Sequence, residues 1–430
     1  MINETVQKLQ DKDKKRLIEN FTSLSVLQGV NYVLPLITIP YLIRVLGAEK
    51  FGLVMFAQAF IMYFNILTDY GFNFSATREI SVCREDKEKV SEIFSSVTAA
   101  KFILLAGSFI LLCAVILIFE KFRQNLPLYY LSFGAVIGQT VFPVWFFQGI
   151  EKMKYIAFFN ILGRLIFTVS VFVFVHKAGD YLYVPLINSA GYIIAGILAF
   201  GFAARNFKTG FFIPKISGVK YRLKEGAYLF ISTSSINVYK TNSVFILGLF
   251  SSSEIVGYFY IAKKSIDVLN HIAGTISTTI YPYVNKKISG SLPSVKRFLK
   301  NIGLVIAVYT LLIGIVLTVF SKDLTVIIAG KGFKETILSI DMLAFVPFIT
   351  GINVPAVQIL LGRKRDKEFF AVLTSAACID IALNFVLVPP FSYIGSCFSV
   401  IITEILVTAG LYAATSARIK PPLPAGTGDV

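Results

Sequence analysis

The sequence predicts an all-α, polytopic membrane protein of about twelve transmembrane helices. Hydrophobic residues make up 55% of the 430 residues and charged residues only 15%, and the mean hydropathy is +0.72. The apolar residues gather in about twelve blocks of roughly twenty residues, the length that spans the hydrocarbon core of a bilayer. A soluble domain of this size could not bury so much apolar surface, so we expect the helices to face lipid.

The apolar blocks divide into two sets of six. The first set is 23–46, 51–71, 97–119, 127–149, 155–176 and 181–204, and the second is 227–250, 255–284, 299–320, 337–361, 368–389 and 394–416. The first block is too long for a signal peptide and lacks a small-residue cleavage site, so it is interpreted as a retained span. The expected organisation is an amino-terminal segment (1–22), a six-helix lobe (23–204), a basic linker (205–226), a second six-helix lobe (227–416) and a tail (417–430).

The basic residues indicate which side of the membrane each loop occupies. Of the 41 Lys and Arg, about 29 fall in alternate loops together with both termini, and about 8 fall on the other side. Positively charged loops stay in the cytoplasm, so both termini are expected there. This placement also explains the formal charge of +16 without any nucleic-acid partner.

The two sets of spans resemble each other. Residues 45–52 (VLGAEKFG) recur loosely as 246–248 (ILG) and 254–257 (EIVG), and 143–159 shares Pro, Gly and Phe-Phe landmarks with 355–370. The matches indicate a duplication. Six spans per half give both halves the same orientation. The basic segment between them, Arg205 to Lys224, is expected to lie on anionic lipid, with a gating role as the alternative.

Ionisable residues far from the span ends are the candidate functional residues. A charge at mid-depth is costly, so it faces a cavity or a partner. The candidates for binding an anionic head group are Arg164, Lys240, Lys263 and Lys264, and those for charge balance or coupling are Asp267, His271, Asp380 and Glu404. Further candidates near span ends are Arg44, Asp69 and Arg78.

The eighth span is the most densely charged. Lys263 and Lys264 precede Asp267 by one helical turn, and His271 follows a turn later. Asp267 neutralises one lysine, which leaves a net positive interior suited to an anion. The alternative is that these charges only pair across helices and hold the bundle together. For Asp69, Arg78 and Arg44, capping and snorkelling are the ordinary alternatives.

Several classes of protein are disfavoured by what the sequence lacks. It contains no Walker A sequence, no HExxH, no GxSxG and no nucleotide-binding glycine loop. The only histidines, His176 and His271, lie far apart, and the four cysteines show no CxxC spacing, so no metal site is expected. These observations favour a secondary transporter or flippase without a cofactor over a pump or an enzyme.

The first two spans resemble a known family. Residues 31–52 (NYVLPLITIPYLIRVLGAEKFG) and 68–81 (TDYGFNFSATREIS) are similar to the amino-terminal signature of bacterial polysaccharide flippases, the O-antigen flippases of Wzx or RfbX type. These belong to the multidrug/oligosaccharidyl-lipid/polysaccharide exporter (MOP) superfamily. The resemblance implies a MATE-like, V-shaped pair of lobes around a central cavity. It also implies translocation of an undecaprenyl-pyrophosphate-linked repeat unit across the bacterial inner membrane, in lipopolysaccharide or other polysaccharide biosynthesis.

A cationic cavity fits that activity, because lysine and arginine bind pyrophosphate. H⁺ or Na⁺ is the expected coupling ion. The expected partners are the lipid-linked oligosaccharide, anionic lipid, and polymerase and chain-length proteins of the same pathway. The alternatives are a multidrug antiporter of the same superfamily, which needs an acidic cavity, and a membrane enzyme or scaffold of polysaccharide assembly.

Overall fold

The computed structural model describes residues 2–207, 212, 214–288, 292–363 and 365–416. Within these ranges the side chains of 2–18, 228, 229, 232, 233, 236, 240, 271–283, 285–288 and 292–296 are outside the description. The helices are α1 (Ile2–Asp69), α2 (Phe72–Cys83), α3 (Lys87–Ile118), α4 (Glu120–Arg123), α5 (Leu126–Val141), α6 (Val144–Gly149), α7 (Met153–Phe174), η1 (Ala178–Leu182), α8 (Tyr183–Asn206), α9 (Ile216–Phe250), α10 (Ser253–Ile288), α11 (Leu292–Val319), α12 (Ser321–Ala329), α13 (Lys334–Leu343), α14 (Val346–Gly362) and α15 (Asp366–Ser416).

The predicted all-α membrane fold is confirmed for the described residues, which contain no strand. Eight of their helical stretches are long and apolar enough to cross a bilayer. Two of these, α1 and α15, are long enough to cross twice, at 68 and 51 residues. The number of twelve crossings stays a prediction.

The two longest helices bend at residues in unusual backbone conformations. Helix α1 turns at Gly47, whose φ of 75° suits a residue without a Cβ, and this point lies between the first two predicted spans. Helix α15 turns at Ser392, with φ 54°, just after Pro389 and Pro390. The hydroxyls of Ser392 and Ser251 lie 2.8 Å apart, so a hydrogen bond holds this second bend against the end of α9.

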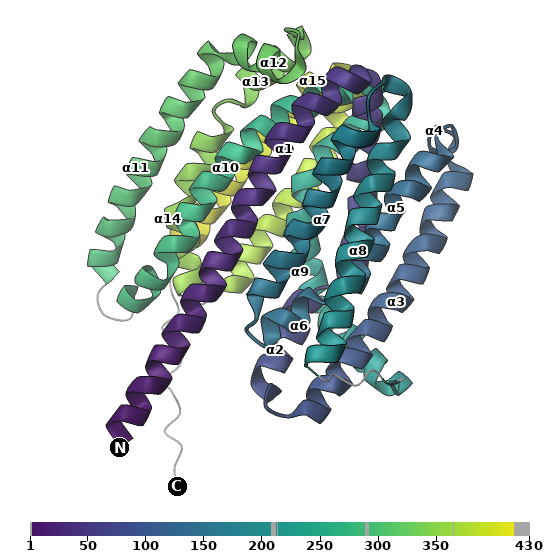
Figure 1. Cartoon of the computed structure of the whole chain (residues 1–430). Coiled ribbons are helices and arrows are strands. Elements are labelled where there is room, and N and C mark those ends of the chain that lie inside the picture. Colours follow the sequence, from purple (N-terminus) through teal and green to yellow (C-terminus); the bar gives the residue numbers. More distant parts are fainter. Residues whose placement is uncertain (1, 208–211, 213, 289–291, 364, 417–430) are drawn as a thin grey trace.

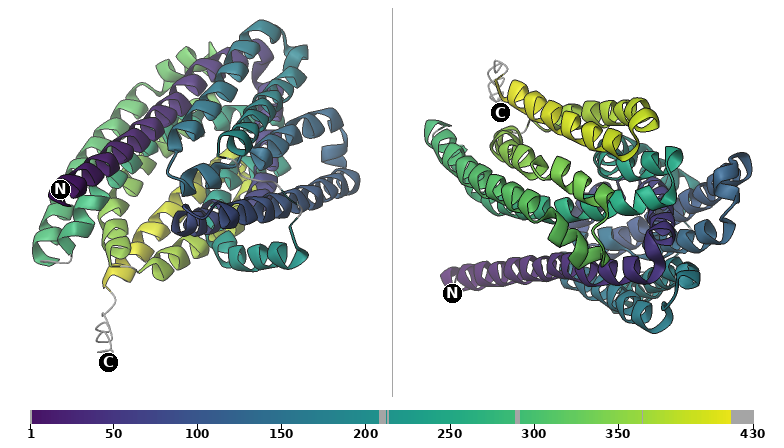
Figure 2. Two further views of the ribbon diagram at one scale, coloured as in Figure 1. Left: turned by 60° about the horizontal axis from the view of Figure 1, so that its bottom comes forward. Right: turned by 90° about the horizontal axis from the view of Figure 1, so that it is seen from above.

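The two halves of the chain lie side by side as two groups of helices (Figure 1). Helices α1 to α8 form the first half, and α9 to α15 form the second half. Viewed from above, the yellow and green helices of the second half lie apart from the blue helices α3 to α5, with α1 and α10 close to the middle (Figure 2). The return arm of α1, residues 48–69, packs against α10, and it packs against α9 through Phe56 and Phe60, whose rings stack on Phe245.

Close helix crossings depend on glycine. Gly134 and Gly138 lie four residues apart on α5, and a Cβ on Gly138 would lie 2.3 Å from the Tyr192 carbonyl carbon in α8. Between the halves, a Cβ on Gly257 of α10 would lie 2.5 Å from the Ala48 carbonyl oxygen. Gly257 and Ala48 belong to the segments 254–257 and 45–52, whose similarity indicates a duplication, and the structure places these two segments against each other.

Candidate functional site

Helix α10 directs two adjacent lysines to different surroundings. Lys263 Nζ lies 3.5 Å from Asp267 Oδ1, one helical turn along. Lys264 instead lines a cavity of about 200 Å³ between α1, α7, α8 and α10, which we call the central chamber. Neighbouring residues of a helix point about 100° apart, so one lysine serves the ion pair and the other serves the chamber.

The central chamber is cationic. Arg164 of α7 lines it together with Lys264, and no carboxylate side chain is among its lining residues. In the part of the chain that the structure describes, neither cation has an ion-pair partner within 4.0 Å, and Arg164 Nε has no hydrogen-bond partner. Both residues lie about eleven residues into their helices, near mid-depth of the bundle. Two half-buried cations that have no ion-pair partner within 4.0 Å among the described residues favour an anionic ligand.

A second cavity, of about 340 Å³, adjoins the central chamber. We call it the polar chamber, and it shares Asn160, Arg164 and Tyr192 with the first. Its other polar lining residues are Asn65, Thr68 and Asp69 of α1, Asn73 of α2, Lys101 of α3, Gln139 of α5 and Asn237 of α9. All but Asn237 belong to the first half of the chain.

Lys101 lines the polar chamber although it is not among the candidate residues that the sequence indicates. The structure places it inside α3, 4% exposed, with Nζ 3.9 Å from Asp69 Oδ1. Asp69 accepts two hydrogen bonds of 2.8 Å from Asn73 Nδ2, so its negative charge is shared between an amide and the lysine. The sequence could have indicated Lys101 as a candidate, because it lies four residues inside the predicted span 97–119.

In the second half of the chain, Asp380 of α15 lies in a polar cluster. Its carboxylate accepts hydrogen bonds from Asn242 Nδ2 at 3.1 Å, Asn384 Nδ2 at 3.0 Å and Ser399 Oγ at 3.0 Å. Tyr63 of α1 donates to Asn242 Oδ1 at 3.2 Å and so connects the cluster to the first half. Asp380 is 1% exposed, and these donors provide the hydrogen bonds that a buried carboxylate requires.

Glu404 lies on the second arm of α15 and accepts a hydrogen bond from the Tyr239 hydroxyl of α9. Lys263 interacts electrostatically with both Glu404 and Asp380. The paired lysine of α10 therefore belongs with the acidic residues of the second half, while Lys264 belongs with the cations of the chambers. Among the described residues, no group of three or more His, Cys, Asp and Glu could hold a metal ion.

Two further candidate arginines lie outside both chambers. The Arg44 guanidinium donates to the Ile327 carbonyl in the last turn of α12, where the terminal carbonyls of the helix lack partners. Arg78 is exposed on α2 and lines a separate pocket. The side chains of Lys240 and His271 lie outside the described residues, so their predicted roles stay predictions.

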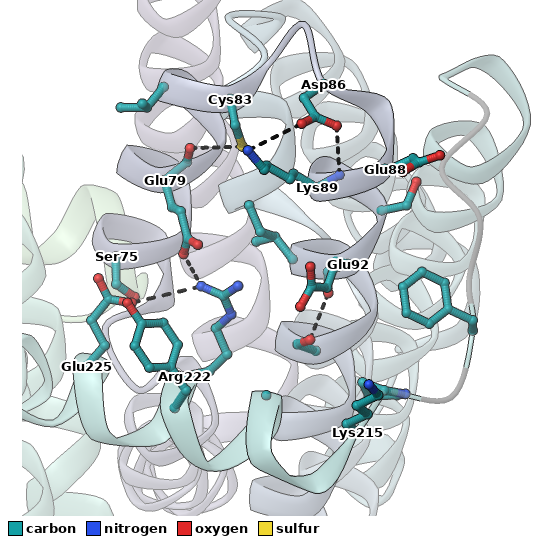
Figure 3. Close-up of a pocket in the computed structure, with 18 of the residues that line it drawn as sticks. Ser75, Glu79, Cys83, Asp86, Glu88, Lys89, Glu92, Lys215, Arg222 and Glu225 are labelled. Carbon is teal, nitrogen blue, oxygen red and sulfur yellow. Dashed lines mark hydrogen bonds and ion pairs between the residues drawn. The ribbon is translucent and has the colours of Figure 1, made fainter.

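That separate pocket, of about 1380 Å³, lies between α2, the start of α3 and the start of α9 (Figure 3). Its lining carries five basic and five acidic side chains: Arg78, Lys87, Lys89, Lys215, Arg222, Glu79, Asp86, Glu88, Glu92 and Glu225. Arg222 points at Glu79 and pairs with it, and Glu225 Oε2 lies 3.9 Å from the same Nη1 atom of Arg222 (Figure 3). The balanced charge distinguishes this pocket from the central chamber, and the Arg222 pair ties the two halves together.

The fold resembles that of several solved membrane transporters. Aligned structures include the lipid II flippase MurJ in an inward closed conformation, with a TM-score of 0.64 and 13% identity over 91% of this chain and 86% of that one. A multidrug resistance MATE family transporter in an inward-facing conformation aligns with a TM-score of 0.63 and 12% identity, over 92% and 97% of the two chains. The protein is thus a multi-pass membrane protein with a transporter fold.

The chain belongs to the polysaccharide biosynthesis protein family, whose sequence model matches residues 17–287. A protein of Escherichia coli K12 named "Putative O-antigen transporter" is 32% identical over 403 residues, which cover 92% of this chain and 96% of that protein. A Shigella dysenteriae protein of the same name is 24% identical over 390 residues, covering 90% and 97%. Both relatives are named as transporters, and neither is named as an enzyme.

Proposed function

We propose that this protein flips an undecaprenyl-pyrophosphate-linked repeat unit of O-antigen or a related polysaccharide from the inner to the outer leaflet of the bacterial inner membrane. The observation that carries the proposal is the pair of cations, Arg164 and Lys264, in a chamber without a carboxylate. The names of the two relatives and the flippase among the similar structures support the same substrate class.

The chemistry of the substrate explains the arrangement. A diphosphate linked to a lipid carries its charge in a compact group between a polar glycan and an apolar tail. Arg164 offers a planar set of donors that matches phosphate oxygens, and Lys264 offers a point charge. The two cations lie on helices of different halves, so a diphosphate between them would join the halves. Rocking of the halves about this site would then carry the head group across.

We further propose that the second half of the chain holds the coupling site. Asp380 and Glu404 are carboxylates inside the bundle, and a proton or a sodium ion bound there would alter the charge that faces Lys263. Asn242, Asn384 and Ser399 supply oxygen atoms of the kind that hard cations prefer. Coupling to the first half would pass through the hydrogen bond from Tyr63 to Asn242.

The proposal extends to the surroundings of the protein. Both termini would be cytoplasmic, and the linker would lie on anionic lipid through its exposed residues Arg205, Lys215, Lys220 and Lys224. Arg222 of the same linker is engaged with Glu79 and is therefore not part of that lipid contact. Polymerase and chain-length proteins of the same pathway are the proposed protein partners.

The test uses purified protein in liposomes that contain a labelled lipid-linked oligosaccharide. Substitution of Arg164 or Lys264 by Ala should slow flipping about tenfold or more, because a hydrogen bond to a charged group contributes about 1.5–3 kcal/mol. Lys264→Arg should retain part of the activity. The matched control is Lys322→Ala, which removes an exposed lysine of α12 remote from both chambers.

Three results would contradict the proposal. Unchanged flipping in both alanine variants would remove the diphosphate role of the central chamber. Transport of organic cations without lipid flipping would identify a multidrug antiporter. We do not expect this result, because Arg164 and Lys264 in the chamber wall would repel an organic cation. A chemically altered lipid product would identify a membrane enzyme.

A further inference from the structure

The polar chamber differs from the central chamber in the chemistry of its wall. Five of its 14 lining residues are carboxamides: Asn65, Asn73, Gln139, Asn160 and Asn237. Its own charged pair, Asp69 and Lys101, cancels in formal charge, so Arg164 at the junction is its remaining cation. The central chamber contains both cations and apolar side chains of α1, such as Leu34 and Ile39, and only three of its 17 lining residues are carboxamides: Gln58, Asn160 and Asn188.

We propose that the polar chamber is the subsite that holds the first sugar of the lipid-linked substrate, next to the diphosphate at Arg164 and Lys264. This inference rests on the proposed function and adds to it the direction in which the substrate lies. A carboxamide carries a donor and an acceptor, and a sugar hydroxyl carries the same two functions. The polar chamber is lined by amides, and the formal charges of Asp69 and Lys101 sum to zero. It therefore suits a ligand with many hydroxyl groups better than a second anion.

Unsatisfied polar atoms in the wall support this assignment. Asn65 Oδ1 and Asn73 Oδ1 are buried and lack a hydrogen-bond partner among the described residues, and so does Arg164 Nε. Buried polar groups without partners are costly, more so inside a membrane protein. A ligand with several hydroxyls would satisfy such groups after small rotations of the side chains. A hydrocarbon tail would leave them unpaired.

The two chambers follow one another in the same order as the groups of the substrate, with the sugar in the polar chamber and the diphosphate, followed by the lipid, in the central chamber. Asn160, Arg164 and Tyr192 line both cavities, so a ligand can extend from one to the other past the guanidinium. The polar chamber is lined by the end of α1 near Asp69 and by the start of α2, on the side of the bundle where the chain begins (Figure 1). The central chamber borders the segment of α1 whose outer face carries the exposed Leu36 and Ile37. The lipid would therefore leave the site along α1, with the sugar on the side of the chain termini.

The experiment compares two probes on the full-length protein. One is undecaprenyl diphosphate carrying a single N-acetylglucosamine, and the other is undecaprenyl diphosphate without sugar. Affinities are measured in detergent for Gln139→Met, Asn65→Ala and Asn237→Ala, three variants on different helices. The matched control is Gln148→Met, since Gln148 lies in α6 outside both chambers.

The expected result is a loss of affinity of about fivefold per variant for the sugar-bearing lipid, from one lost hydrogen bond. Binding of the sugar-free lipid should stay within about twofold of the unmodified protein, and Arg164→Ala should weaken both probes. Equal effects of the three variants on both probes, or no effect on either, would overturn the subsite assignment. Failure of the unmodified protein to bind either probe would overturn the proposed function instead. Melting temperatures identify any variant that has lost its fold, and the conclusion then depends on the other two.

Discussion

At the scale of single residues, Asp380 shows how a buried charge is stabilised by neutral donors. Three side chains from α9 and both arms of α15 donate to its two oxygens. Lys263 and Asp267 show the opposite case, in which two charges of one helix compensate each other at 3.5 Å. The neighbouring Lys264 has no such partner among the described residues, which is why its charge is available to a ligand.

We predict that Asp380→Asn destabilises the protein and removes its response to the coupling ion. The new amide group presents hydrogens to donors that already point at it, and one unsatisfied buried donor costs about 1–3 kcal/mol. The measurements are the melting temperature and the dependence of flipping on pH and on Na⁺. Thr325→Val, a hydroxyl lost from a buried site in α12, is the control for a lost buried hydrogen bond. Retained ion dependence in Asp380→Asn would exclude Asp380 from coupling.

At the scale of elements, single residues at a helix end determine where the helix begins. Helix α3 begins after Asp86, whose carboxylate accepts a hydrogen bond of 3.1 Å from the Lys89 backbone N–H and so caps the helix. That hydrogen bond lowers the pKa of Asp86 below its ordinary value of 3.8. A lowered pKa means that the ionised side chain stabilises the first turn above the ordinary pKa, and that this stabilisation is lost as the pH falls through the folded-state value.

We therefore expect the first turn of α3 to loosen under acid. Hydrogen exchange of the Lys89 amide, corrected for its intrinsic rate, should accelerate as the pH falls below about 4 in the unmodified protein. In Asp86→Asn the protection of this amide should lack that acid step, because no carboxylate is present to titrate. Glu88→Gln is the matched control, since it removes a neighbouring charge and keeps the cap. An acid step that persists in Asp86→Asn would refute the assignment.

At the scale of the whole molecule, the two halves are tied at both ends of the bundle. At the end opposite the termini, Arg44 of α1 holds the Ile327 carbonyl, and Lys121 of α4 donates to the Leu249 carbonyl at 2.9 Å (Figure 1). The glycine crossing of α1 and α10 joins the same two halves. At the other end, the tie is the pair of Arg222 with Glu79. If the halves rock, these ties must open in turn.

We predict that removing the ties opposite the termini opens the central chamber to that side. In a variant without the four native cysteines, Thr38→Cys places a thiol in the central chamber. Its reaction with a membrane-impermeant maleimide added on the side opposite the termini should be slow, and adding Arg44→Ala and Lys121→Ala should accelerate it severalfold. Adding Lys322→Ala instead should have no effect. Equal rates in all three proteins would show that these contacts do not close the chamber.

Much of the architecture could be predicted from the sequence, because a bilayer requires each spanning segment to be apolar and to satisfy its own backbone hydrogen bonds. The apolar blocks predicted the membrane helices, and the turning point of α1 at Gly47 falls in the gap between two predicted spans. The small-residue spacing from Gly134 to Gly138 is typical of a close helix contact, and α5 crosses α8 closely at Gly138. The charges of α10 identified the region of the candidate site.

The sequence by itself therefore determined that this is an all-helical membrane protein, and it selected Arg164, Lys264 and Asp380 as residues inside the bundle, because the cost of burying a charge depends on depth along one helix. Which charge meets which partner depends on the rotation and packing of several helices, and only the tertiary structure decided it. Helix packing placed Lys264 in the wall of the central chamber and brought Lys101 beside Asp69, 32 residues earlier in the chain. The amides of the polar chamber come from α1, α2, α5, α7 and α9, and no local pattern relates them. Their common wall exists only because those helices pack around one space.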